Sequence, residues 1–122
     1  MEKTDYKNVF VFAEQRDGVI QSVALELLGK AHELAGVLNE KVVAVLPGHN
    51  ITKHAQMLIE HGADDVICID EPELKDYLTE QYAQTICQVV EKFKPSILMI
   101  GATTIGRDLG PRLAARLTTG LT

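Results

Sequence analysis

The stretch from residue 101 to residue 112 carries the residue types best suited to binding an anion. It reads GATTIGRDLGPR. Gly106 allows the backbone to approach a ligand closely, and Thr103 and Thr104 offer hydroxyl groups. If a helix begins near Gly106, its unpaired amides and its dipole favour a negative charge there. Since Arg107 adds a permanent cation with a planar set of donors, these four residues form a candidate site for a phosphate or a carboxylate.

The same stretch also fits a purely structural role. A threonine that caps the helix, with Arg107 paired to Asp108, to Glu14 or to an acid of a partner, would explain the residue types without a ligand. Arg112 and Arg116 are four residues apart, so together with Arg107 they predict one basic helix face. That face either contacts solvent or docks a partner. The three-residue motif Gly106-Arg107-Asp108 is too short to decide between these interpretations.

Other residue patterns that support chemistry are absent from the sequence. Neither the dinucleotide fingerprint G-x-G-x-x-G nor the phosphate loop G-x-x-x-x-G-K-[ST] follows the first apolar run. No Ser-His-Asp or Cys-His set has a recognisable spacing. Cys68 and Cys87 lie in apolar stretches typical of core positions, and His54 and His61 are too far apart on a helix to share a metal. We therefore expect no catalytic group and no metal site.

Four apolar runs predict the strands that must position the candidate site. Each run is apolar on both of its faces, which is typical of parallel strands covered by helices on both sides. The runs lie at residues 8–13, 42–46, 65–69 and 96–100. Helical spacing follows each run, at residues 22–38, 52–61, 79–93 and 106–117. Ser22 and Thr79 are the expected N-caps of the first and third helices.

This alternation predicts an α/β fold with a doubly wound parallel sheet and right-handed crossovers. The expected strand order is 3-2-1-4, with a further strand supplied from beyond this chain or from a partner. Ligands of such sheets bind beyond the carboxyl ends of the strands, where the strand order reverses. The loops at 14–21 and 101–108 should therefore meet. Glu14 would there bind a ribose hydroxyl, orient Arg107 or lie in a surface turn.

Length and charge narrow the class of protein. A chain of 122 residues suits one domain, here residues 1–122. The net charge of −5 disfavours nucleic acid as a partner, and it disfavours a polybasic membrane anchor. No apolar run is long enough to cross a membrane, and no signal segment is recognisable, so we expect a cytoplasmic protein. The abrupt end at residues 118–122 suggests a fragment of a longer protein.

Five stretches of the chain form a recognisable set of motifs. They are VFVFAE at 9–14, LELLGKA at 25–31, HGAD at 61–64, GATTIGRDLGPRLAAR at 101–116 and TGLT at 119–122. Together they resemble the N-terminal domain of the electron-transferring flavoprotein alpha subunit, a Rossmann-like domain of the adenine-nucleotide-hydrolase-like superfamily. The similarity extends from about residue 6 to the end of the chain. The motif at 101–116 is the most specific, because it is long and ordered.

The resemblance implies a heterodimer with a beta subunit of similar fold. In this family the C-terminal domain of the alpha subunit, absent here, binds FAD. The beta subunit binds AMP, or a second FAD in electron-bifurcating members. This domain is then a non-catalytic scaffold and subunit interface. The complex passes electrons through FAD from acyl-CoA or other flavin dehydrogenases to downstream acceptors, and bifurcating members also use NADH. Thr103, Thr104, Gly106 and Arg107 would lie near the beta subunit's nucleotide or FAD.

A second hypothesis treats the chain as a small stand-alone module that binds an adenine nucleotide, as universal stress proteins of the same superfamily do. It rests on the two loops at the reversal of strand order and on Arg107. A hydrolase or an adenylating enzyme is disfavoured, because the sequence lacks a phosphate loop and an activated nucleophile.

Overall fold

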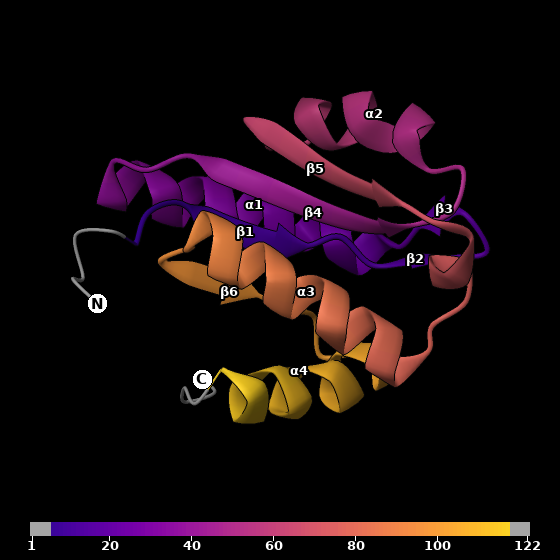
Figure 1. Cartoon of the computed structure of the whole chain (residues 1–122). Coiled ribbons are helices and arrows are strands. Elements are labelled where there is room, and N and C mark those ends of the chain that lie inside the picture. Colours follow the sequence, from indigo (N-terminus) through magenta and orange to yellow (C-terminus); the bar gives the residue numbers. More distant parts are fainter. Residues whose placement is uncertain (1–5, 118–122) are drawn as a thin grey trace.

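Four parallel strands form the central sheet of this computed structural model, which describes residues 6–117 (Figure 1). They pair in the order β5-β4-β1-β6. The strands are β1 (Val9–Phe12), β4 (Val42–Gly48), β5 (Asp65–Asp70) and β6 (Ile97–Met99). This is the predicted order 3-2-1-4, so the expected doubly wound α/β fold is confirmed. The predicted motif at residues 119–122 lies outside the described residues.

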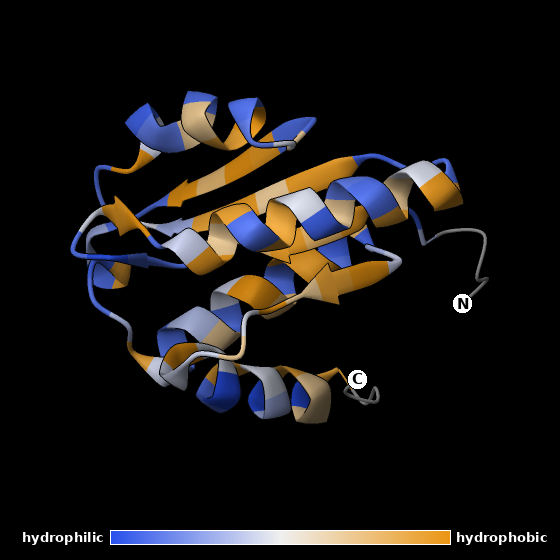
Figure 2. Cartoon of the chain, turned by 180° about the vertical axis from the view of Figure 1, so that it is seen from behind, coloured by the Kyte–Doolittle hydropathy of each residue, from blue (hydrophilic) through white to orange (hydrophobic). Residues whose placement is uncertain are grey.

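Helices cover both faces of the sheet. The helices are α1 (Ser22–Leu38), α2 (Ala55–Glu60), α3 (Thr79–Phe93) and α4 (Thr104–Arg116), with 3₁₀ turns η2 (Thr52–His54) and η3 (Pro72–Leu74). The first two helices pack on one face, and α3 and α4 pack on the other. Figure 2 shows the strands as predominantly hydrophobic and the helices as amphipathic. Within the described part of the chain, no helix combines the length and hydrophobicity of a membrane span.

The central strand β1 supplies the two halves of the core in alternation. Val9 and Val11 pack in the cluster on the α1 face, whereas Phe10 and Phe12 pack in the cluster on the α3 face. Side chains of successive strand residues point to opposite faces, so a run that is apolar throughout must be covered on both sides. This confirms the physical basis of the strand predictions.

Two predicted helix caps are wrong. The N-cap of α1 is Gln21, and Ser22 is already the first helical residue. The N-cap of α3 is Leu78, because the Thr79 hydroxyl donates instead to Asp108 of α4. A long-range hydrogen-bond partner has therefore replaced the local backbone amide that a cap would bind.

The loop between β1 and α1 contains a hairpin that the sequence analysis missed. Its strands are β2 (Gln15–Arg16) and β3 (Val19–Ile20), which pair antiparallel. Asp17 and Gly18 connect them with φ angles of 53° and 77°. Two successive positive φ angles are typical of a type I′ turn, which Asp-Gly favours.

Candidate functional site

The two loops predicted to meet at the reversal of strand order do meet. Glu14 follows β1, and Thr103 precedes α4, which follows the neighbouring strand β6. The Thr103 hydroxyl donates to Glu14 Oε1 at 2.6 Å and accepts the Gly106 amide at 3.0 Å. Thr103 is therefore the N-cap of α4, and it also ties this helix to the end of β1.

Glu14 is a buried acid rather than part of a surface turn. Only 3% of its surface is exposed. Its side chain accepts the Thr103 hydroxyl, and it makes no ion pair with Arg107. A buried carboxylate destabilises a protein unless hydrogen-bond donors replace the water that it loses. The hydrogen bond from Thr103 therefore stabilises Glu14 in its buried position. The hypotheses that Glu14 orients Arg107 or lies at the surface are therefore wrong.

Two glycines of the site are required by the packing of the chain against itself. A Cβ atom on Gly106 would lie 1.8 Å from the carbonyl oxygen of Gly101. A Cβ atom on Gly101 would lie 2.6 Å from a methyl carbon of Val23 in α1. Both distances are far below van der Waals contact. The close approach predicted for a ligand is therefore made by the protein's own backbone and core.

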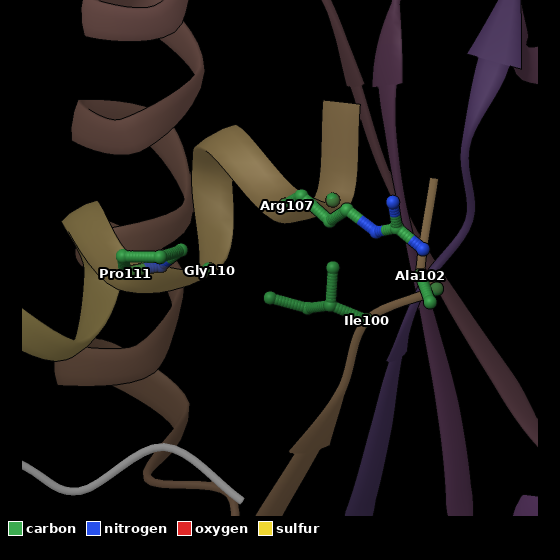
Figure 3. Close-up of a pocket in the computed structure, with 7 residues that line it drawn as sticks. Ile100, Ala102, Arg107, Gly110 and Pro111 are labelled. Atoms are coloured by element: carbon green, nitrogen blue, oxygen red, sulfur yellow. The ribbon is translucent and has the colours of Figure 1, made fainter. Parts of the chain in front are cut away.

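A shallow pocket of about 300 Å³ remains beside these glycines (Figure 3). It is lined by Ile100, Gly101, Ala102, Gly106, Arg107, Gly110 and Pro111. The Arg107 side chain extends past Ala102, and Gly110 and Pro111 form the opposite side. The volume is at the low end for small-molecule sites, and Arg107 is the one charged lining residue. The described residues thus offer an anchor for an anionic group but do not enclose a flavin dinucleotide.

Arg107 is exposed and pairs with no acid among residues 6–117. The first turn of α4 adds the amides of Thr104 and Ile105, which by their position lack a helical partner. The Gly106 amide is already bound to Thr103. Of the four residues predicted to bind an anion, Arg107 and Thr104 have exposed polar side chains. Thr103 and Gly106 instead hydrogen-bond to each other and fix the loop that precedes α4.

The predicted basic face of α4 is largely neutralised. Arg112 lies 3.5 Å from a carboxylate oxygen of Glu80 in α3 and 3.6 Å from one of Asp108. Arg116 also pairs with Glu80. Two of the three arginines therefore join α4 to α3, and Arg107 alone of the three is left for another partner.

Asp108 is the centre of a polar cluster between α3 and α4 that the sequence analysis did not find. It accepts hydrogen bonds from the Tyr77 and Thr79 hydroxyls, each at 2.7 Å. The Tyr77 hydrogen bond, followed by that of Thr79, holds the pKa of Asp108 below its usual value. Burial, assisted by Asp108, raises the pKa of Tyr77 to about 12. Tyr77 and Thr79 are 31 and 29 residues from Asp108 in the sequence, so no pattern of local spacing predicts the cluster.

The described residues contain no group of three His, Cys, Asp or Glu side chains that could hold a metal ion. Cys68 and Cys87 are thiols that form no disulfide with each other, and burial raises the pKa of both. A raised thiol pKa lowers the fraction of the reactive thiolate. Cys87 is a buried core side chain, as predicted, and Cys68 is a partly buried side chain that packs against the core.

The geometry defines a Rossmann-like α/β domain whose ligand crevice is largely filled by the chain itself. The fold is similar to a solved structure described as a universal stress protein in complex with cAMP. The TM-score is 0.63 and the sequence identity 17%, with 96% of this chain and 94% of that chain covered. At this identity the likeness establishes the fold alone.

The family follows from sequence comparison. The model described as "Electron transfer flavoprotein domain" matches residues 9–122, so the chain belongs to the electron transfer flavoprotein family. All 122 residues align at 57% identity with the electron transfer flavoprotein subunit alpha of Clostridium acetobutylicum. They align at 45% identity with the LctC subunit of lactate dehydrogenase (NAD(+),ferredoxin) of Acetobacterium woodii. The chain spans 36% and 29% of these relatives. The predicted resemblance to the alpha subunit is confirmed.

Proposed function

We propose that this chain is the N-terminal scaffold and subunit-interface domain of an electron-transferring flavoprotein alpha subunit. The observation that carries the proposal is the filled crevice at the reversal of strand order. Where related folds bind a nucleotide, Gly106 packs on Gly101 and Glu14 is bonded to Thr103. A domain built in this way supports a cofactor held elsewhere rather than enclosing one.

The flavin chemistry then belongs to the parts of the complex outside residues 1–122. FAD, when bound in a C-terminal domain of the alpha subunit, would supply the electron transfer. The proposed partner is the beta subunit, which would carry AMP or a second FAD, and the electron donors are acyl-CoA or other flavin dehydrogenases. The A. woodii relative is named for NAD(+) and ferredoxin, which supports bifurcation as a variant of this function. The cytoplasmic location stays a prediction.

Flavin binding by the chain alone tests the central proposal. Purified chain, incubated with excess FAD and desalted, should be colourless. The full-length alpha subunit, prepared together with its beta subunit, should retain flavin under the same conditions. A stoichiometric flavin spectrum from residues 1–122 alone would contradict the scaffold role.

Arg107 is the residue of the pocket proposed to face the partner's nucleotide or FAD, with Thr104 beside it and with Thr103 and Gly106 supporting the loop. The support is its exposure and its lack of an acidic partner in the described region. In the full complex, Arg107→Ala should shift the flavin potential or weaken nicotinamide binding. Arg116→Ala on the same helix is the control, because Arg116 pairs with Glu80. Unchanged redox titrations would assign Arg107 a structural role.

A stand-alone nucleotide-binding module is the second hypothesis, and the filled crevice makes it the weaker one. Calorimetric titration of the chain with AMP, ADP and ATP separates the two. Saturable binding would favour the module, whereas an absence of binding at millimolar nucleotide would eliminate it.

A further inference from the structure

The hairpin formed by β2 and β3 is held by a buried glutamine at its base. Gln15 is only 7% exposed. Its amide oxygen accepts the Gly18 amide across the turn at 2.9 Å. Its nitrogen donates to the Tyr82 hydroxyl of α3 at 3.0 Å and reaches the Lys75 carbonyl at 3.4 Å. One side chain thus fixes the shape of the turn and joins the hairpin to α3.

The tip and the second strand have further anchors. His54 Nε2 lies 2.6 Å from the Gly18 carbonyl oxygen, which it can bind as a donor whether the ring is neutral or protonated. The Gln21 side chain donates to the Val19 carbonyl at 3.0 Å. Ile20 packs into the core cluster on the α1 face. The hairpin is therefore held from both faces of the sheet, by η2 and by α3.

The outer surface of this anchored hairpin presents an unusual pair of side chains. Arg16 and Val19 are cross-strand partners, and opposite residues of an antiparallel pair project on the same side. Val19 is 60% exposed, and Arg16 is exposed with no ion pair to any described residue. The result is an apolar contact point beside an unpaired cation.

A fixed hairpin is well suited to docking. Ordering a flexible loop costs free energy at the moment of association, and a loop that is already ordered avoids this cost. The hairpin also adjoins the pocket at Arg107, because β1 and β6 are neighbours and Glu14 is bonded to Thr103. A partner that reaches Arg107 would therefore meet the hairpin as well.

We propose that the hairpin Gln15–Ile20 is a docking element for the beta subunit, with Val19 seated in a shallow apolar depression and Arg16 paired to a carboxylate of that subunit. This rests on the proposed function for the identity of the partner. A second copy of this chain is a poorer fit, because each copy carries a net charge of −5 and the two would repel each other.

The test measures the dissociation constant between full-length alpha subunit and beta subunit. The variants are Arg16→Glu and Val19→Ser. Their matched controls are Lys30→Glu and Val37→Ser, both on exposed positions of α1, where Val37 is 84% exposed. Each hairpin variant should weaken binding by about 10-fold or more, as expected for a central interface residue. The controls should stay within about twofold, since surface substitutions elsewhere change little.

The outcomes separate the two proposals. If wild-type subunits associate and the hairpin variants bind as the controls do, the docking role is wrong and the scaffold function stands. If wild-type subunits do not associate, both are wrong. Self-association of the alpha subunit that the hairpin variants abolish would assign the hairpin to a homodimer and overturn the choice of partner. Melting temperatures of all variants confirm that the fold is intact.

Discussion

Gly106 shows how one residue can be essential for packing at a position that resembles a ligand site. An added Cβ would lie 1.8 Å from the Gly101 carbonyl oxygen, so α4 would have to move away from the end of β6. The backbone cannot yield as a flexible side chain can. The glycine is therefore needed to bring Thr103 and Arg107 to their observed positions.

Gly106→Ala should lower the free energy of unfolding by about 3 kcal/mol, as severe overpacking does. Gly36→Ala is the matched control, because its helical site in α1 has no heavy atom within 4 Å of the added Cβ. That change should instead stabilise the fold by about 0.5–1 kcal/mol. Urea unfolding of both variants measures the difference. Equal stability would show that α4 adapts to the extra carbon.

Asp108 and Tyr77 make the contact between α3 and α4 dependent on pH. The folded state lowers the pKa of Asp108, so its contribution to stability is present above the usual aspartate pKa and is lost as the pH falls through the folded value. The folded state raises the pKa of Tyr77 to about 12. Its contribution is complete below the unfolded value of about 10 and is lost as the pH rises towards 12.

Tyr77→Phe should therefore raise the pKa of Asp108 towards its usual value. The variant lacks the Tyr77 hydroxyl, whose hydrogen bond to Asp108 is the largest cause of the lowered pKa. NMR titration of the carboxyl carbon measures this directly. The variant should also lose less stability than the wild type between pH 10 and 12. A folded variant whose Asp108 titrates unchanged would assign the low pKa to Arg112 and Thr79 instead.

At the scale of elements, the start of α4 depends on a hydrogen bond between residues 89 positions apart. Sequence reasoning predicted both loops and a threonine cap. It could not predict that the cap would also satisfy a buried acid, because Glu14 is buried only after β1, β4 and β6 assemble. The cap expected at Thr79 was wrong for a similar reason, because its hydroxyl donates to Asp108 of α4. Local preference is weak, and a tertiary partner outweighs it.

Thr103→Val should destabilise the fold by about 2 kcal/mol, because it removes the cap and leaves Glu14 without its donor. Thr103→Ser keeps the hydroxyl and should cost less than about 0.5 kcal/mol. Comparing Thr103→Val in wild type and in Glu14→Gln, by chemical denaturation, gives the coupling between the two residues. A coupling energy near zero would mean that the bond contributes nothing to stability.

At the scale of the whole molecule, β6 is an edge strand whose side chains are only partly buried. α4 packs on the same face as α3. A right-handed crossover from β6 through α4 would therefore continue outward and place a following strand against the free edge of β6. The chain spans about a third of its alpha-subunit relatives, so the further strand expected from the sequence stays a proposal for the longer protein.

Hydrogen exchange tests this proposal. The outward-pointing amides of β6 should exchange at least about 10-fold more slowly in the full-length alpha subunit than in residues 1–122. Amides of β4, which has neighbours on both sides, serve as the internal control. Equal exchange of β6 in both proteins would show that the edge stays open.

The sequence by itself determined the four strands of the central sheet, their order and the family, because continuous apolar runs, alternation with helices and a long motif are local properties of the chain. Only the tertiary structure decided how the candidate site is used. Arg112 and Arg116 are neutralised by Glu80, and Gln15 holds a hairpin through Tyr82, 67 residues away. Such pairings arise when distant segments pack, and no spacing along the chain encodes them.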